Sequence, residues 1–167
     1  MIPHPTPDPV RPAQESVWDY PRPAIAQMTG AHLRIEFEGR VLAETRNGVR
    51  TLETSHPPSY YFPPADVDQS MLALAGGSSS ICEWKGQARY FDVIGSTRRL
   101  SRVGWAYPAP TRAFDILRDH IAFYAAPMDA CFVNGERVTP QPGGFYGGWI
   151  TSAVAGPFKG PPGTQFW

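Results

Sequence analysis

Short runs of alternating apolar residues, each closed by a turn dipeptide, constrain this chain more than any other feature. Along residues 32–39, apolar and polar side chains alternate, so that one face of an extended strand carries Leu33, Ile35 and Phe37. The strand ends at Glu38-Gly39, and the run RVLAET resumes directly behind it. This pattern predicts short antiparallel strands joined by tight turns.

Two Asn-Gly dipeptides add to the prediction, because this pair tolerates positive φ at both central positions of a turn. Asn47-Gly48 predicts that the run VRTLET returns as the next strand, and Asn134-Gly135 predicts a second hairpin. Together the patterns predict about eight strands and two short helices, at residues 63–74 and 111–120. With 19 prolines and 16 glycines, the composition favours the same loop-rich, mainly β class.

The length of 167 residues favours a single domain, and the composition divides the chain into three parts. Residues 1–28 form a proline-rich arm, residues 29–139 the core domain, and residues 140–167 an arm rich in glycine, proline and aromatics. Large aromatic side chains in irregular arms usually dock on a surface, and those of the arms are Trp18, Tyr20, Phe145, Tyr146 and Trp149. One hypothesis is therefore a protein-interaction module, with a homodimer formed through the arms.

The charge and the cysteines limit the partners and the compartment. Acidic and basic residues balance to a net charge of zero, which disfavours binding to nucleic acid or to an anionic membrane. No apolar run is long enough for a membrane span, and the first residues lack the pattern of a signal peptide. Cys82 and Cys131 are too few for a disulfide framework, so a reducing cytoplasm is expected.

Several sequence blocks occur in one order, among them LETSHPPSYYFPPADV, CEWKGQARYFDV and VNGERVTPQPGGFYGGW. In these blocks the chain resembles the bacterial family known as domain of unknown function 427, from about Arg11 to Trp167. The resemblance implies a β-tent-like fold over residues 31–139, in which two antiparallel sheets meet at an angle. The family is sometimes labelled nucleotidyltransferase-like, which supplies an alternative function.

The segment ETSHPPSYYF concentrates polar chemistry. Glu53 ends a strand, where its carboxylate can form an ion pair with Lys85 or Arg50, or serve a ligand. His56 precedes two prolines that hold it extended, which suits a residue at the rim of a pocket as well as a general base.

Lysine and aromatic residues complete the candidate site. Lys85-Gly86 predicts a turn that presents the lysine to a carboxylate or phosphate, although a solvated turn lysine is equally consistent. Trp105 and Tyr107 stand two residues apart and so share one face of a strand, as core residues or as the wall of a pocket. The sequence thus predicts a small-molecule site, for a binder or a catalyst, formed by Glu53, His56, Tyr61, Lys85, Trp105 and Tyr107.

Other sites are disfavoured by the residue pattern. Cys82 has no local signature of a nucleophile, so a buried structural thiol is expected. The chain has no Cys-x-x-Cys and no His-x-x-x-His spacing, and neither a metal nor a cofactor is predicted. No Walker-type loop is present, and the Asp66/Asp68 pair lies at a predicted helix start, where acids favour the helix dipole.

Overall fold

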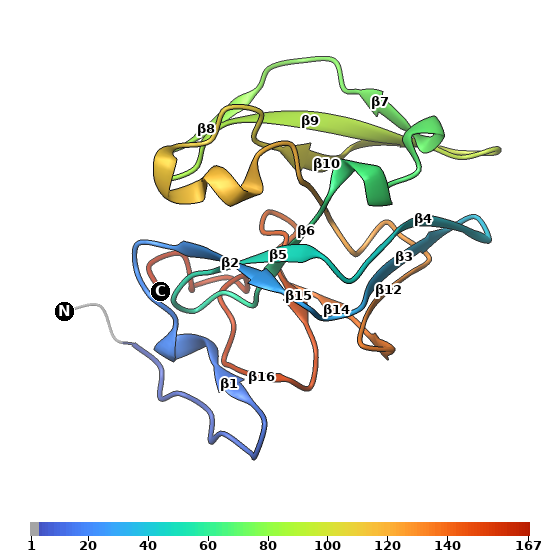
Figure 1. Cartoon of the computed structure of the whole chain (residues 1–167). Coiled ribbons are helices and arrows are strands. Elements are labelled where there is room, and N and C mark those ends of the chain that lie inside the picture. Colours follow the sequence, from blue (N-terminus) through green and yellow to red (C-terminus); the bar gives the residue numbers. More distant parts are fainter. Residues whose placement is uncertain (1–3) are drawn as a thin grey trace.

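Two antiparallel β-sheets lie against each other in the computed structural model, which describes residues 4–167 (Figure 1). In order, the larger sheet contains β2 (Ile25–Thr29), β5 (Gly48–Leu52), β6 (Ser59–Phe62), β11 (Ile121–Phe123), β10 (Arg99–Ala106), β9 (Gly86–Ile94) and β7 (Leu72–Leu74), with β8 (Ser80–Cys82) also paired to β9. The smaller sheet contains β13 (Glu136–Arg137), β12 (Ala130–Val133), β3 (Leu33–Phe37) and β4 (Arg40–Thr45). The predicted mainly β, antiparallel fold is confirmed.

The two Asn-Gly dipeptides behave differently. Asn134 and Gly135 have φ of 50° and 80° and join β12 to β13 as the predicted hairpin. Asn47-Gly48 does not form a hairpin, because β4 pairs with β3 whereas β5 pairs with β2 and β6 in the other sheet. Neither residue has positive φ, and a Cβ on Gly48 would lie 2.7 Å from Leu33 Cδ1. Glycine is needed there for close packing where the chain crosses between the sheets.

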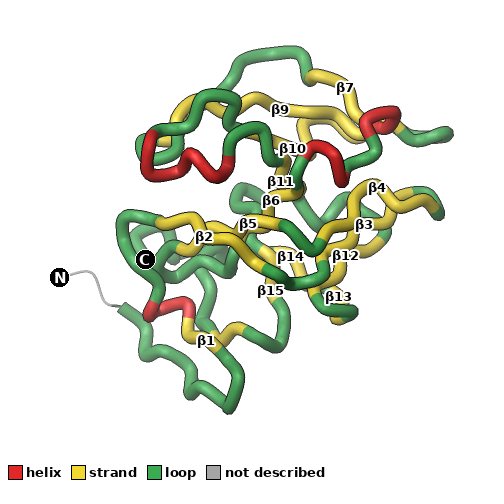
Figure 2. The backbone as a smooth tube through the Cα atoms, viewed as in Figure 1, coloured by secondary structure: helices red, strands yellow, loops and turns green. Residues whose placement is uncertain are grey.

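The helices are shorter than predicted, and all of them are 3-10 helices within residues 4–167 (Figure 2). The prediction over residues 63–74 is wrong in type: η2 (Pro64–Asp66) and η3 (Gln69–Met71) are separated by the extended residue Val67. Val67 is buried and bridges to Ala43, so tertiary packing overrides the helix signal. The second prediction is reduced to η4 (Arg112–Leu117), which is kinked at its middle.

The larger sheet buries both of its faces. Alternate residues of β6 show this, since Tyr60 and Phe62 pack in the main core with β3 and β4, whereas Tyr61 packs on the opposite face. On β10, Trp105 shares the face of Tyr61. The predicted pairing of Trp105 and Tyr107 on one face therefore holds, and both belong to the second, more aromatic cluster.

Both arms pack on their own chain. β1 (Glu15–Ser16) pairs with β16 (Val154–Ala155), and the two arms run side by side in Figure 1. In the C-terminal arm, β14 (Thr139–Pro140) pairs with β15 (Trp149–Ile150). The Trp149 side chain is buried, and its indole N–H donates to the Phe123 carbonyl at 3.0 Å. The homodimer through the arms stays a prediction.

Within residues 4–167, no helix has the length and the apolar character that crossing a membrane requires.

Candidate functional site

One cavity of about 400 Å³ opens on the aromatic face of the larger sheet. All six residues predicted from the sequence line it, and they are Glu53, His56, Tyr61, Lys85, Trp105 and Tyr107. Glu53 and His56 belong to the connection between β5 and β6, and Lys85 to the turn between β8 and β9. Segments far apart in the sequence therefore bring the predicted set to one place.

Interlocked aromatic rings form one wall of this cavity. The Trp105 indole N–H donates to the Tyr61 hydroxyl at 3.2 Å, and the two rings meet nearly perpendicularly, at 88°. The ring of Tyr124 lies 4.8 Å from that of Trp105. Because such contacts fix the rings, this wall is preformed.

Tyr107 differs from its neighbours in one respect. Its side chain is 6% exposed, yet its hydroxyl has no hydrogen-bond partner among residues 4–167. Among the described residues, Ser55 Oγ is the side-chain polar atom that is both fully buried and without a hydrogen-bond partner. The Tyr107 hydroxyl also has no partner, so it is not fully buried and remains accessible from the cavity. Burial raises the pKa of the Tyr107 hydroxyl well above its usual value, so the group is neutral and can donate to a ligand.

Two lysines line the cavity, Lys85 and Lys159, and they are the only lysines in the sequence. Neither forms an ion pair with an Asp or Glu side chain of the described residues, unlike several arginines of this chain. Lys85 Nζ lies 3.8 Å from Cys82 Sγ, and Lys159 Nζ donates to a main-chain oxygen of Trp167 at 3.3 Å. Two ammonium groups without an Asp or Glu partner make the cavity attractive to an anion.

The turn that carries Lys85 requires its glycine. Gly86 has φ of 111°, a conformation that side chains with a Cβ rarely adopt. A Cβ on Gly86 would also lie 3.2 Å from the Ala109 carbonyl oxygen. The predicted lysine-glycine turn is thus present, and the expected alternative of a Lys85–Glu53 ion pair is not formed within the described residues.

His56 is held between an amide and a carboxylate. Its Nδ1 lies 3.0 Å from Gln141 Nε2, and its Nε2 lies 3.5 Å from Glu53 Oε2. Burial lowers the pKa of His56 to about 4, and the positive charges of Lys159, Arg22 and Lys85 act in the same direction. At neutral pH the ring is therefore uncharged.

Cys82 corrects an expectation from the sequence. It is half-buried and lines the cavity beside Lys85, so it is not the buried structural thiol that was expected. Cys131 has that role instead: it is 2% exposed, and burial raises the pKa of its thiol to about 12. In the hairpin β8–β9, Cys82 pairs with Gly86, which has no side chain to cover the thiol.

Sequence reasoning missed the contribution of the C-terminal arm to this cavity. The arm supplies Gln141, Phe145, Tyr146, Gly147 and Lys159. The ring of Tyr146 stacks edge-on against that of His56 at 4.8 Å, and Lys159 Nζ lies 5.5 Å from the centre of the Tyr146 ring. One available signal was the rarity of lysine, since the arm holds the second of two.

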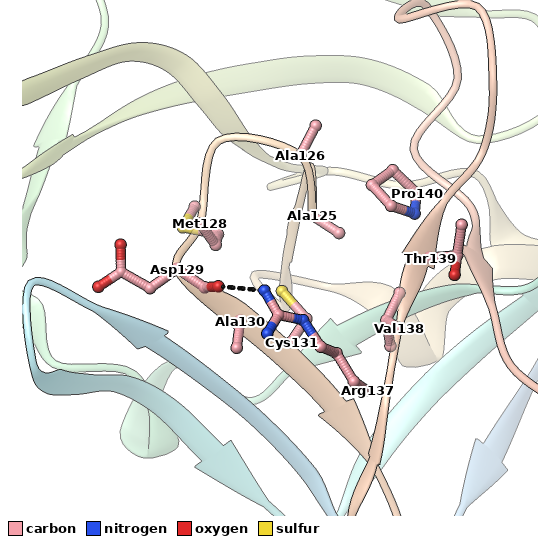
Figure 3. Close-up of a pocket in the computed structure, with 10 residues that line it drawn as sticks. All are labelled: Ala125, Ala126, Met128, Asp129, Ala130, Cys131, Arg137, Val138, Thr139 and Pro140. Carbon is pink, nitrogen blue, oxygen red and sulfur yellow. Dashed lines mark hydrogen bonds between the residues drawn. The ribbon is translucent and has the colours of Figure 1, made fainter.

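A second hollow of about 410 Å³ lies between the end of β11 and the hairpin β12–β13 (Figure 3). Its polar groups are already paired within the protein. The Arg137 guanidinium donates to the Asp129 carbonyl at 2.9 Å, as Figure 3 shows, and Asp129 Oδ2 accepts from the Glu38 backbone N–H at 2.7 Å. This hollow lacks the unpaired cations of the first.

Residues 4–167 contain no cluster of three or more His, Cys, Asp and Glu side chains that could hold a metal ion. Asp66 and Asp68 lie outside the aromatic cavity and have structural partners. Asp66 accepts from the Thr45 hydroxyl at 2.6 Å, and Asp68 pairs with Arg40 at 3.0 Å. Their position at the start of a regular helix was predicted wrongly, and they serve to join η2 and η3 to β4.

Comparison with protein families identifies a family for this chain. A family described as "Domain of unknown function (DUF427)" matches residues 25–134, which is more than half of the chain. No curated protein matches the sequence. The matched segment includes all six residues that were predicted, whereas Gln141, Tyr146 and Lys159 lie beyond it.

Proposed function

The chain belongs to the domain of unknown function 427 family, and we propose that its aromatic cavity binds a small planar molecule that carries an anionic group. The observation that carries this proposal is the position of the two lysines. Of 15 basic residues, only two are lysines, and both line this cavity without an aspartate or glutamate partner among residues 4–167. Buried or half-buried cations usually have a partner, so a ligand anion fits here.

Each part of the cavity has a role in the proposal. Lys85 and Lys159 hold the anionic group as flexible point charges. Tyr61, Trp105 and Tyr107 provide a preformed wall for a planar ring. Glu53, whose carboxylate lies beside His56 Nε2, orients a ligand group that can donate a hydrogen bond. A volume of about 400 Å³ suits a small molecule.

A titration of planar anions against their neutral analogues tests the proposal. Benzenesulfonate and phenyl phosphate are compared with benzenesulfonamide and phenol by isothermal titration calorimetry and thermal shift. We expect the two anions to bind and to raise the melting temperature, because a ligand that binds only the folded state stabilises it. The neutral analogues should bind at least about tenfold more weakly, since they lose the charge-assisted contacts.

Matched variants locate the binding site. Lys85→Ala and Lys159→Ala should each weaken anion binding by about tenfold. Arg46→Ala is the control, because Arg46 is exposed, lies outside the cavity and carries the same charge. Equal affinity for charged and neutral analogues, or equal losses in all three variants, would refute the proposal.

We also propose a reducing bacterial cytoplasm as the compartment of this binder. Support comes from Cys82 and Cys131, which are both free thiols and lie in separate clusters.

A further inference from the structure

One amide of the C-terminal arm, that of Gln141, lines the cavity and forms a hydrogen bond with the His56 ring. Gln141 is 4% exposed, and its side-chain amide forms three hydrogen bonds within the protein. An amide side chain can be placed in two orientations, and its neighbours determine which one is correct. For Gln141, two neighbours are backbone groups with fixed roles.

The first neighbour is the backbone N–H of Gly148, which can only donate. It lies 3.0 Å from Gln141 Oε1, so this side of the amide is the acceptor. The second neighbour is the carbonyl of Lys159, which can only accept. It lies 2.8 Å from Gln141 Nε2, so this side is the donor. Both neighbours give the same orientation of the amide.

The orientation of Gln141 sets the tautomer of His56. The remaining hydrogen on Gln141 Nε2 points to His56 Nδ1 at 3.0 Å, which must then be the acceptor. In a neutral imidazole the proton therefore sits on Nε2. That N–H faces Glu53 Oε2 at 3.5 Å, a distance too long for a good hydrogen bond, so it remains available to a ligand.

We infer that Gln141 is a positioning residue that holds His56 as the Nε2–H tautomer, so that His56 donates a hydrogen bond to the bound anion and does not act as a base. This inference rests on the proposed function of the cavity. The anionic group of the ligand would accept hydrogen bonds from three kinds of donor: the ammonium groups of Lys85 and Lys159, the Tyr107 hydroxyl and the His56 N–H.

The charges around the ring support this role. Lys159, Arg22 and Lys85 all disfavour a second proton on the ring, and the lowered pKa of His56 agrees with a neutral ring. Among the described residues, Glu53 is the acid that faces the His56 ring, and the Tyr146 ring packs against the His56 ring in a T-shaped contact. Because the positive charge for the anion comes from the lysines, binding does not require protonation of His56.

Nuclear magnetic resonance of the full-length chain with 15N-labelled histidine tests the tautomer without any ligand. Protonated and unprotonated ring nitrogens give distinct resonances, and we expect His56 at pH 7 to show a proton on Nε2 and none on Nδ1. In Gln141→Glu the new carboxylate can only accept, so the proton should move to Nδ1 or the ring should become charged. A proton on Nδ1 of the unaltered protein would overturn the inference.

Benzenesulfonate is the binding probe for the second readout, because its charge is constant across the pH range used. We expect its affinity for the unaltered protein to differ by less than about twofold between pH 6.0 and 7.5, and to fall about tenfold in Gln141→Glu. Gln141→Met removes the donor without adding a charge, and it should weaken binding as well. An affinity that rises steeply as the pH falls would show a protonated His56 and overturn the inference.

The two readouts separate the inference from the proposed function. If benzenesulfonate fails to bind while His56 carries its proton on Nε2, the proposed function fails and the assigned tautomer stands. If benzenesulfonate binds and His56 carries its proton on Nδ1, the proposed function stands and the positioning role of Gln141 is wrong.

Discussion

Lys85 and Tyr107 show how single residues define the cavity. Both line a cavity with aromatic walls, and neither polar end has a strong partner in the described chain. Lys85 Nζ has the Cys82 sulfur at 3.8 Å and the centre of the Phe114 ring at 5.8 Å, and the Tyr107 hydroxyl has no hydrogen-bond partner. A buried polar group without a partner costs free energy. Such groups are retained where a ligand supplies the missing hydrogen-bond or charge partner, which is the physical basis of the site proposed here.

Tyr107→Phe tests this idea at the scale of one atom. The change removes a hydroxyl that has no partner in the described protein, so the free energy of unfolding should change by less than about 0.5 kcal/mol. Benzenesulfonate binding should weaken by about fivefold to tenfold, because one donor to the anion is lost. Chemical denaturation and calorimetry measure the two effects. A large loss of stability with unchanged affinity would contradict the assigned role.

His56 makes stability depend on pH in a predictable direction. Its pKa is about 4 in the folded protein and 6.5 for an unperturbed group, so between these values the unfolded chain binds the additional proton. The His56 contribution is fully present above pH 6.5 and is lost as the pH falls towards 4, by at most about 3 kcal/mol.

Urea denaturation at several pH values between 7.5 and 4.5 measures this dependence. The free energy of unfolding of His56→Gln should fall less over that range than that of the unaltered protein. His120→Gln is the control, since the His120 ring forms a hydrogen bond with the Arg118 carbonyl and lies outside the cavity. Parallel curves for the unaltered protein and His56→Gln would show that the ring titrates normally.

At the scale of elements, alternation and turn chemistry predicted the strands that carry most of the candidate site. The strand predicted to carry Trp105 and Tyr107 is β10, and Trp105 lies on the same face of the sheet as Tyr61 of β6. β7 could not be predicted, because residues 72–74 follow a proline and acids that favour a helix start, and only pairing with β9 makes them a strand. The Asn47-Gly48 dipeptide predicted a hairpin from local turn preference alone. The chain instead crosses from one sheet to the other at this point, and this crossing depends on close contacts of Gly48 with Leu33 and Tyr61, which lie beyond the turn in the sequence.

The part of the site that lies in the C-terminal arm could not be placed from the sequence for the same reason. Gln141 and His56 are 85 residues apart in the sequence, and no periodicity relates them. The arm is irregular, so its side chains are placed by individual hydrogen bonds. The six predicted residues came from regular elements and from turns with a recognisable dipeptide.

Strand β10 contains a bulge that one acid stabilises. The pairing of β10 with β9 shifts between Leu100 and Gly104, and Arg102 has φ of 54°. Asp92 is 6% exposed; its Oδ1 accepts from the Arg102 backbone N–H at 2.8 Å, and its Oδ2 accepts from Arg99. The bulge precedes Trp105, so it helps to orient the wall of the cavity.

Asp92→Ala should lower the free energy of unfolding by about 2 kcal/mol, because the Arg102 N–H and the Arg99 guanidinium lose their acceptor. Asp115→Ala is the matched control: its side chain is 64% exposed and pairs with Arg118 at the surface, so the expected loss is below about 1 kcal/mol. Urea denaturation measures both. Equal losses would show that Asp92 has no special role at the bulge.

At the scale of the whole molecule, the arms belong to the folded unit. Val17 and Tyr20 of the N-terminal arm pack with Leu52 and Val154, and Trp149 packs with the core between the two sheets. The C-terminal arm also lines the cavity with Gln141 and Lys159. The stability of the fold and the shape of the cavity therefore depend on the same segment.

Trp149→Ala tests this dependence. Trp149 is 1% exposed, and loss of its side chain leaves a large hole in the core, with an expected cost of about 3–5 kcal/mol. Phe145→Ala is the control in the same arm, because Phe145 is 76% exposed and should change stability by less than about 0.5 kcal/mol. A loss below about 1 kcal/mol for Trp149→Ala would mean that the arm is not part of the folded core.

The most direct test of an anion site uses the fact that the chain contains two lysines. In protein labelled with 13C at lysine Cε, nuclear magnetic resonance gives one side-chain signal for Lys85 and one for Lys159. On addition of benzenesulfonate, both signals should move along one saturable curve with the same midpoint, because one ligand contacts both ammonium groups. If neither signal moves, or if the two move with different midpoints, the two lysines do not form one anion-binding cavity.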